Sequence, residues 1–462
     1  MGAFARASPL GTPGPARWRG STRRDAVAAS MPGRILMAAQ ATVGHTNALR
    51  SIGRALVAGG HAVAMALPVV RAPAFAPEMV RTAAAIPDAV RGDGIEVIAL
   101  RPSWSAAWHA LQVARSTGYE ELRHALGLFT AGLTGHARAL AEAARSWRAD
   151  VIVADYLFFA GWLAARLAKL PCAALFHSAL PFPSIGGPPF GSGLPSGAPR
   201  DAAWAEAQRR LDEANAYAGA RIRGAARRLG VDLPPGDIIS RPYSGDLNLL
   251  TTLPELEPGL APLDGPVVFT GPCTAGRAQE RPDDPSLSVL RDGVRRIYVS
   301  LGTVFNSKPE TFAAILRGLD DEGQQVVVSA GASARKLSEH PPARNCHIFT
   351  RVPQVALLER VDAVVTHGGN NTTQETLAAG KPMLVIPFGG DQLENARRIE
   401  RLGAGIALLP PQVSGESVRA AMARLRSEPA FQEAAAGAAR ALGAAGGTRR
   451  AADAVLALIA RR

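Results

Sequence analysis

Residues 363–396 read AVVTHGGNNTTQETLAAGKPMLVIPFGGDQLENA. The apolar run at 363–366 predicts a buried strand, Gly368-Gly369 a tight turn, and the residues that follow a helix ending near Gly380. A second apolar run, at 383–386, leads into another turn and another helix. Strands that alternate with helices are typical of parallel βαβ units, so this stretch predicts part of a doubly wound sheet.

The same alternation extends over most of the chain. It predicts an N-terminal set of strands at 35–39, 61–67, 95–100, 151–154, 172–176 and 247–251, and a C-terminal set at 297–301, 326–329, 347–350, 363–366 and 383–386. A long helical stretch is expected at 111–147. We therefore predict an α/β protein in which two doubly wound, Rossmann-like domains face a central cleft.

The predicted boundaries follow the density of proline and glycine. We expect an N-terminal domain at 31–253, an interdomain connection at 254–290 that holds a short strand at 267–270, and a C-terminal domain at 291–430. A C-terminal helix at 431–462 is expected to pack back across both domains. A further Pro/Gly-rich tract, 181–199, predicts a long surface loop.

Composition agrees with a globular protein of two or three domains. The 462 residues are 47% hydrophobic and 19% charged. The net charge of +12 would suit an anionic partner, but only four of the 51 basic residues are lysine, and this arginine bias is also typical of codon composition. Without clustered Lys/Arg and interleaved aromatics, we do not expect nucleic-acid binding.

Cysteine content and hydropathy bear on the compartment. Three widely spaced cysteines form no CxxC motif, which disfavours a disulfide framework or a structural zinc site. No apolar stretch of about 18 residues could cross a bilayer. We therefore expect a cytoplasmic protein in a reducing compartment; peripheral membrane contact stays open, as does the choice between monomer and homodimer.

Residues 1–30 differ from the rest of the chain. They hold five arginines and a single acid, Asp25, among Ala, Ser, Pro and Gly. A transit peptide has this composition. Because Met31 directly precedes the first predicted strand and no clean cleavage signal is present, we favour a disordered extension upstream of the true start.

The turn after the strand at 363–366 has the chemistry of an anion site. Gly-Gly lets the backbone approach a ligand, and the following helix presents unpaired N–H groups and a positive dipole end, which suit a pyrophosphate. His367, Asn371 and Thr372 add donors, and Asp391 with Gln392 suits sugar hydroxyls. An alternative is that Thr372-x-x-Glu375 forms a capping box and serves only the helix.

The whole run, from Val352-Pro353-Gln354 through Ala396, resembles the donor-binding signature of the family 1 (UDP-dependent) glycosyltransferases, which include bacterial macrolide and natural-product enzymes. The resemblance implies the GT-B fold, with an acceptor-binding domain at 31–253 and a nucleotide-sugar-binding domain at 291–430. It implies that His367, Asn371 and Thr372 hold a diphosphate, that Glu375 binds the ribose, and that Asp391 and Gln392 hold the sugar. Gly369 and Asn370 belong to the same turn.

Two neighbouring segments extend this resemblance. Ser300-Leu301-Gly302-Thr303 is similar to the family's loop beside the diphosphate. Many members carry Trp before Val352, stacked on uracil, whereas this chain has Arg351, whose guanidinium plane can also stack on a base. The base is therefore either uracil or thymine. With Val352 and Gln354, these residues complete the predicted donor site.

The N-terminal half supplies a candidate base. Gly44-His45-Thr46-Asn47 resembles the family's Gly-His-x-x-Pro turn, and Asp155, after the strand at 151–154, should reach the same sheet edge. Histidine suits proton abstraction near neutral pH, and a carboxylate can orient it. Taken singly, His45 could be a turn histidine bonded to backbone and Asp155 a helix N-cap; together we interpret them as a catalytic dyad.

The resemblance implies an inverting transferase that moves a hexose from a nucleoside-diphosphate sugar, expected to be a UDP-sugar, to a hydroxyl of a lipophilic small molecule, without a metal or other cofactor. Alternatives are a silent partner that activates another transferase, a nucleotide-sugar epimerase and a lipid-linked sugar transferase. Aromatic residues are expected to make the acceptor half of the cleft apolar: Trp104, Trp108, Phe158, Phe159, Phe176, Phe182 and Phe190.

Overall fold

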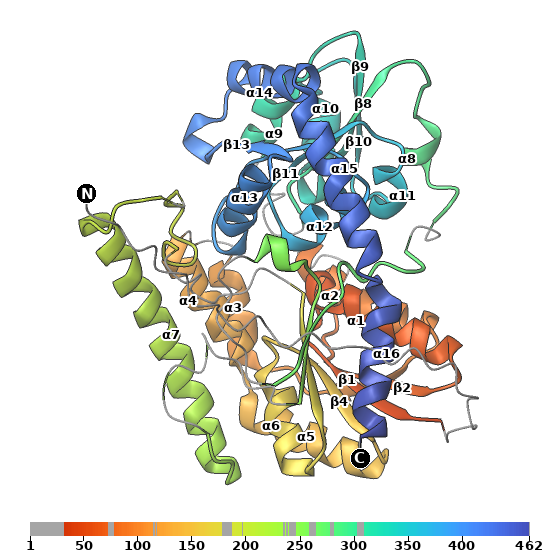
Figure 1. The fold of residues 1–462 in the computed structure, drawn as a ribbon, viewed down its shortest axis with the longest axis vertical. Coiled ribbons are helices and arrows are strands. Elements are labelled where there is room, and N and C mark those ends of the chain that lie inside the picture. Colours follow the sequence, from red (N-terminus) through yellow and green to blue (C-terminus); the bar gives the residue numbers. More distant parts are fainter. Residues whose placement is uncertain are drawn as a thin grey trace, which may run out of the picture. The chain divides into compact units, whose positions relative to one another are not determined.

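The computed structural model describes residues 32–72, 78–113, 116, 118–177, 187–195, 197–233, 236, 239, 246–257, 265–277, 281–302 and 309–461. From Gly33 onward the chain forms one compact unit. Two sheets of strands organise this unit, and both are flanked by helices (Figure 1).

The first sheet has seven parallel strands in the order β3-β2-β1-β4-β5-β6-β7. The chain reverses direction across the sheet at β1 and β4, which pair directly, with Ile35 opposite Val151. Ligands of doubly wound folds bind at this kind of switch point, beyond the carboxyl ends of the strands. The strands are β1 (Arg34–Ala38), β2 (Ala62–Pro68), β3 (Glu96–Leu100), β4 (Val151–Asp155), β5 (Cys172–Phe176), β6 (Leu247–Leu250) and β7 (Val267–Phe269).

The second sheet has six parallel strands in the order β10-β9-β8-β11-β12-β13. Its switch point lies between β8 and β11, where Ser300 is paired with Thr366. The strands are β8 (Arg295–Ser300), β9 (Gln324–Ser329), β10 (Cys346–Phe349), β11 (Ala363–Thr366), β12 (Met383–Val385) and β13 (Gly405–Ala407). The predicted fold class, α/β with two doubly wound halves, is confirmed.

Helices cover both faces of each sheet. They are α1 (Val43–Ala58), α2 (Glu78–Gly92), α3 (Trp104–Val113), α4 (Gly118–Phe129), α5 (Leu133–Ser146), α6 (Phe159–Ala168), α7 (Ala202–Leu229), α8 (Pro285–Ser288), α9 (Pro309–Gly318), α10 (Ala334–Glu339), α11 (Gln354–Leu358), α12 (Asn370–Ala378), α13 (Asp391–Leu402), α14 (Gly415–Ser427), α15 (Pro429–Ala444) and α16 (Gly447–Ala460).

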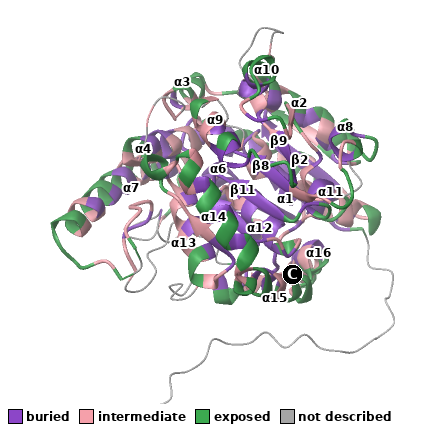
Figure 2. Cartoon of the chain, turned by 90° about the horizontal axis from the view of Figure 1, so that it is seen from above, coloured by how far each residue is buried: buried purple, intermediate pink, exposed green. Residues whose placement is uncertain are grey.

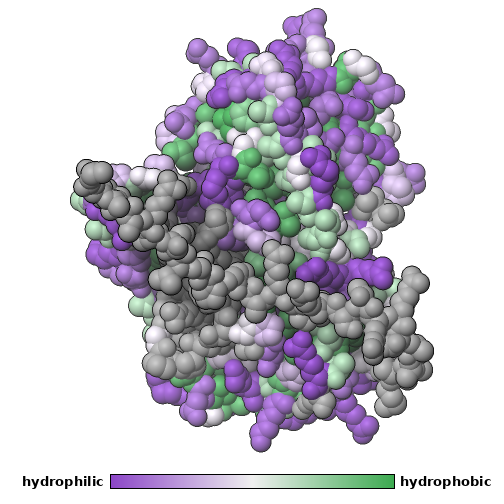
Figure 3. Space-filling view, viewed as in Figure 1, coloured by the Kyte–Doolittle hydropathy of each residue, from purple (hydrophilic) through white to green (hydrophobic). Residues whose placement is uncertain are grey.

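The inner strands β1, β4 and β5 are mostly apolar and buried because neither face of the sheet meets water there. In β1, Ile35 and Met37 belong to one core cluster, with residues of α1 and α16, while Leu36 and Ala38 belong to another, with residues of α5, α6 and α7. Buried residues follow the strands in Figure 2. Hydrophilic residues, in contrast, are spread over much of the face drawn in Figure 3.

The predicted helical stretch at 111–147 is wrong as a single element. It is divided into α3, α4 and α5, and α3 begins earlier, at Trp104. Gly118, where α4 begins, has φ +62°, and Gly132, before α5, has φ +67°. Glycine adopts this left-handed conformation without the steric cost that a side chain brings, so each of these glycines marks a change of chain direction.

The C-terminal helix expected at 431–462 is also two helices. The break lies at Gly446 and Gly447, with φ of +91° and +50°. Helix α15 packs on α12 beside the second sheet, and α16 packs on α1 beside the first. The last thirty residues therefore contact both halves, as Figure 1 shows in blue.

Two strands qualify the predicted layout. Strand β7 lies within the proposed connection at 254–290, yet it pairs with β6 as an edge strand of the first sheet. Strand β13 has only three residues and was not expected from the sequence. The domain boundaries themselves stay a prediction. Among the helices that are described, none is long and apolar enough to cross a membrane.

Close packing of α6 on β4 fixes the strand that ends in Asp155. A Cβ atom on Gly161 would lie 2.6 Å from the Cβ of Ala154 and 3.4 Å from that of Ala38. We expect Gly161→Ala to destabilise the protein by about 1–3 kcal/mol through overpacking. Gly135→Ala in α5 is the control, because its Cβ would meet open space and alanine favours a helix. Thermal unfolding measures both; a melting temperature for Gly161→Ala at or above that of the control would contradict this packing.

Candidate active site

A cavity of about 560 Å³ lies where the carboxyl ends of the two sets of strands meet. Its volume is typical of small-molecule sites, which span roughly 300–1,000 Å³. Of the site residues predicted from sequence, the cavity is lined by His45, Gly302, Arg351, Val352, Gln354, His367, Gly369, Asn370, Asn371, Thr372, Glu375, Asp391 and Gln392. Asp155 lies behind His45, and Thr303 is outside the described residues.

His45 and Asp155 form a hydrogen-bonded pair. Helix α1 begins at Val43, which places His45 in its first turn, and Asp155 is the last residue of β4. His45 Nδ1 lies 3.0 Å from Asp155 Oδ1, which also accepts the backbone N–H of Leu157 at 3.0 Å. Because a carboxylate only accepts, Nδ1 carries the proton and Nε2 is left with a free electron pair.

Neither alternative for this pair holds in the structure. The N-cap of α6 is Phe158, so Asp155 does not cap that helix. Burial alone would raise the pKa of Asp155, but the imidazoles of His177 and His45 outweigh that effect and hold the pKa well below its ordinary value. Asp155 is therefore an ionised, buried carboxylate beside His45 Nδ1.

His177 is a third member of this cluster, and sequence reasoning missed it. It follows β5 directly, and its Nδ1 contacts Asp155 Oδ2, while its ring meets that of His45 edge-on with centroids 4.3 Å apart. A polar residue after a buried strand beside β4 was the available signal. Within the described part of the chain, His45, Asp155 and His177 also make a group that could hold a metal ion, with donor atoms within 4.8 Å of one another.

His367 is enclosed by two glycines. A Cβ on Gly302 would lie 2.5 Å from His367 Nε2, and one on Gly369 would lie 2.4 Å from it. The ring therefore requires glycine on both sides, which explains both predicted positions. Burial lowers the pKa of His367 to about 4, although a hydrogen bond with the Ser300 backbone acts in the opposite direction. At neutral pH this side chain offers an N–H dipole and no charge.

Glu375 does not form a capping box. The N-cap of α12 is Gly369, and Glu375 lies inside the helix, with its carboxylate bound by Gln354 Nε2 at 2.7 Å and by Arg277. Gln354 Oε1 accepts from Tyr298 Oη at 3.0 Å and from Thr372 Oγ1 at 3.3 Å. Gln354 thus connects Glu375 with Tyr298 and Thr372 at the cavity wall.

Two asparagines at the start of α12 reach the first sheet. Asn370 Nδ2 donates to the backbone carbonyl of His177, and Asn371 Nδ2 donates to that of Gly44 at 3.3 Å. Both carbonyls lie next to the His45–Asp155–His177 cluster. In the structure these amides bridge the two sheets, a contact that the predicted role in diphosphate binding did not include.

Asp391 and Gln392 begin α13. Burial raises the pKa of Asp391 to about 6, while the charges of Arg398 and His45 pull it down. The effect of His45 shows that the predicted base and the predicted sugar-binding carboxylate are close enough to interact. Gln392 Oε1 accepts the backbone N–H of Phe388 at 2.9 Å, which closes the turn before the helix.

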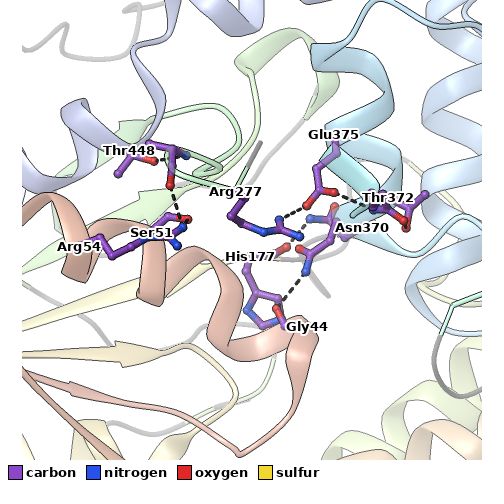
Figure 4. Close-up of polar contacts among 12 residues, drawn as sticks. Gly44, Ser51, Arg54, His177, Arg277, Asn370, Thr372, Glu375 and Thr448 are labelled. Atoms are coloured by element: carbon purple, nitrogen blue, oxygen red, sulfur yellow. Dashed lines mark hydrogen bonds and ion pairs between the residues drawn. The ribbon is translucent and has the colours of Figure 1, made fainter. Parts of the chain in front are cut away.

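Arg277 is a second residue that sequence reasoning missed. Nothing in its Pro/Gly-rich surroundings distinguishes it, yet its guanidinium pairs with Glu375 (Figure 4). Ala275, two residues before Arg277, is bound by both α1 and α16: its carbonyl accepts from Arg54 at 2.8 Å, and its N–H donates to Thr448 at 3.2 Å. Helices α1 and α16 therefore fix the segment that presents Arg277.

The guanidinium of Arg351, which was expected to stack on a base, already has a hydrogen-bond partner in the structure. The guanidinium lines the cavity, but it also donates to Thr82 Oγ1 in α2. Stacking on a base would require the guanidinium to keep or exchange this contact. The role of Arg351 therefore stays a prediction.

The expected aromatic acceptor wall is largely wrong. Trp104 and Trp108 are 93% and 53% exposed, and neither lines the cavity. Phe158, Phe159 and Phe176 belong to the cores beside the first sheet, and Phe182 is outside the described residues. Phe190 does line the cavity. The apolar wall is built mostly by residues of α4 and its neighbours: Leu122, Ala125, Leu126, Phe129, Leu157, Leu211 and Ile239, with Glu121 and Asn215 among them.

Comparison with known proteins agrees with this geometry. The family described as UDP-glucoronosyl and UDP-glucosyl transferase matches residues 261–439. This segment is similar to that family. It contains the donor-site residues His367, Glu375 and Asp391, whereas His45 and Asp155 lie outside it.

Relatives and solved structures extend the likeness. The chain is 31% identical to the uncharacterized UDP-glucosyltransferase YojK of Bacillus subtilis over 46% of this chain and 52% of that protein, and 28% identical to 4'-demethylrebeccamycin synthase of Lentzea aerocolonigenes over 62% and 68%. The chain spans about half the length of the first curated relatives that it matches. The crystal structure of CalG4, the calicheamicin glycosyltransferase, superposes with a TM-score of 0.67 at 23% identity over 94% of this chain and 99% of that one. The fold is therefore GT-B.

The raised pKa of Asp391 predicts a pH effect on stability. A group that binds its proton more tightly in the folded state stabilises the protein fully at pH values below its unfolded pKa, 3.8. This stabilisation is lost as the pH rises through 6. Relative to wild type, the unfolding free energy of Asp391→Asn should therefore increase between pH 4 and 6, by at most about 3 kcal/mol. The titration of His367 changes stability in the opposite direction, but it does so equally in both proteins and therefore cancels in the difference.

Denaturant unfolding at several pH values measures this difference. Asp292→Asn, at a fully exposed side chain, is the control and should follow wild type. An Asp391→Asn curve parallel to that of wild type would show that Asp391 titrates normally in the folded protein.

Proposed function

We propose that the protein is an inverting glycosyltransferase that moves a hexose from a nucleoside-diphosphate sugar to a hydroxyl of a lipophilic small molecule. The observation that carries the proposal is one cavity lined both by His45, paired with Asp155, and by the donor residues His367, Glu375 and Asp391. UDP-sugars are the expected donors, since the matching family is described by them.

The donor would lie along α12. Its diphosphate suits the N-terminus of this helix, where backbone N–H groups and the dipole attract an anion. His367 adds a neutral N–H donor, which stabilises developing charge without carrying a charge of its own. Glu375 would accept the ribose hydroxyls, and Asp391 with Gln392 would hold the sugar close to His45.

His45 would act as the general base. Its Nδ1 proton is engaged by Asp155, so Nε2 is free to take the proton of an acceptor hydroxyl. The acceptor oxygen then forms a bond to the anomeric carbon on the face opposite the diphosphate, and the bond to the diphosphate oxygen breaks. Attack in this geometry converts an α-linked donor into a β-glycoside. The imidazolium that forms is paired with the ionised Asp155.

The acceptor class follows from the cavity wall. Apolar side chains of α4 and the residues around it, including Leu122, Leu126 and Phe129, face the cavity near His45, and Phe129 lies 4.9 Å from the His45 ring, centroid to centroid. Such a wall favours a lipophilic hydroxylated molecule. The natural-product enzymes among the relatives agree with this class.

The rival functions lack a supporting observation. A silent partner that only activates another transferase would be free to lose the base or the donor residues, but His45, Asp155, His367 and Glu375 are all present and assembled around one cavity. The epimerase and the lipid-linked transferase stay alternatives that product analysis separates directly.

Replacement of the base should separate catalysis from binding. We expect His45→Ala to lower kcat by roughly 10²- to 10⁴-fold, the usual contribution of general base catalysis, while UDP still raises the melting temperature as in wild type. His340→Ala, at an exposed position in the second half, should change neither. Loss of UDP binding together with activity would make His45 structural; a wild-type protein that binds neither UDP nor TDP and transfers no sugar would refute the proposed function.

Metal removal should have no effect on transfer. The proposed chemistry uses a helix N-terminus and side-chain donors for the diphosphate, so extensive treatment with EDTA should leave the transfer rate unchanged. The informative contrast is addition of Zn²⁺, for which His45, Asp155 and His177 are suitable ligands. An activity that falls on chelation and returns with a divalent ion would contradict the metal-independent mechanism.

A further inference from the structure

His177 is a buried histidine that the proposed mechanism does not use. It stands directly after β5, and its Nδ1 contacts the one oxygen of Asp155, Oδ2, that His45 leaves unused. We propose that His177 is a positioning residue, which holds Asp155 in the orientation that makes His45 an effective base. This inference rests on the proposed function.

The hydrogen bonds of Asp155 explain why a second imidazole matters. Asp155 is fully buried, so each carboxylate oxygen needs a donor within the protein. Oδ1 is supplied by His45 and by the N–H of Leu157. Oδ2 lies against Nδ1 of His177 in a close polar contact that lacks the alignment of a hydrogen bond. Contacts on both oxygens restrict the plane of the carboxylate more than the two hydrogen bonds to Oδ1 would alone.

The protonation state of His177 suits this role. Burial lowers its pKa, and this effect exceeds the opposite influence of Asp155, so the ring is neutral. A neutral imidazole that contacts a carboxylate through Nδ1 must carry its proton there. His177 therefore shares the negative charge of Asp155 without adding a positive charge, which leaves Asp155 available to pair with the imidazolium formed on His45.

His177 is also held from the donor side. Its backbone carbonyl accepts the side-chain amide of Asn370, the first residue of α12, and Asn371 binds the carbonyl of Gly44 next to His45 (Figure 4). The helix proposed to bind the diphosphate is thus connected by its first two side chains to the backbone of His177 and to that of Gly44, the residue before His45. The position of the base is thereby coupled to that of the donor site.

The charges around His45 set the expected pH effect. The titratable groups that face it are Asp155 at the end of β4, His177 after β5 and Asp391 at the start of α13. Without His177, the negative charge of Asp155 is shared with fewer partners and pairs more strongly with a protonated His45. This change moves the acid limb of the activity profile to higher pH.

Two substitutions separate this role from simple packing. His177→Phe keeps a planar ring but removes the donor, whereas His177→Asn places an amide N–H near the position of Nδ1. We expect His177→Phe to lower kcat by about 10- to 100-fold, the factor expected for one hydrogen bond to a charged group, with KM for the UDP-sugar changed by less than about threefold. The pH of half-maximal kcat on the acid side should rise by roughly one unit.

The outcomes are distinguishable. His177→Asn should restore most of kcat and the wild-type pH profile, and UDP should raise the melting temperature of both variants as it does for wild type.

Wild-type kcat and pH profile in His177→Phe would overturn the positioning role, and so would equal losses in Phe and Asn variants that still bind UDP. Absence of transfer by the wild-type protein would instead refute the proposed function. If His177→Phe does not fold, the acid side of the His177→Asn pH profile decides alone. A pH of half-maximal kcat that differs from that of wild type by more than one unit would then overturn the inference.

Discussion

A buried carboxylate that must be satisfied from within the protein is the constraint on which this site depends. Asp155 ends β4 at the switch point of the first sheet, where its carboxylate is buried from solvent. Its polar contacts come from three different places in the chain: the first turn of α1, the turn after β4 and the residue after β5. Because burying an ionised group without such contacts is costly, the fold fixes His45 and His177 around Asp155 with little freedom.

The second constraint is the attachment of α12 to the first sheet. Asn370 and Asn371 bind carbonyls beside the histidines, and Glu375 pairs with Arg277, which is presented by a segment bound to α1 and α16. A helix N-terminus suited to a diphosphate and an imidazole suited to proton abstraction are thereby brought to one cavity. Neither half of the chain carries both, which is why the chemistry belongs to the assembled pair of sheets.

Much of this arrangement could be predicted from the sequence. The apolar runs located the main strands because parallel strands buried on both faces are apolar throughout, and the polar residues after them marked the sheet edge where His45, Asp155, His367 and Asp391 lie. The breaks at Gly118 and Gly132 were missed because a glycine within a helical pattern does not reveal its φ. His177 and Arg277 were missed because their partners are distant in sequence and become visible only when β4 and β5, or the connection and α12, are placed side by side.

The central claim is that a nucleoside diphosphate binds with its phosphates at the start of α12, facing His45. A crystal structure of the protein with UDP tests it most directly. The account predicts phosphate oxygens within hydrogen-bonding distance of His367 and of backbone N–H groups at the start of α12, with the ribose hydroxyls on Glu375. UDP bound in the reverse orientation, with its base at α12, or bound outside this cavity, would contradict it.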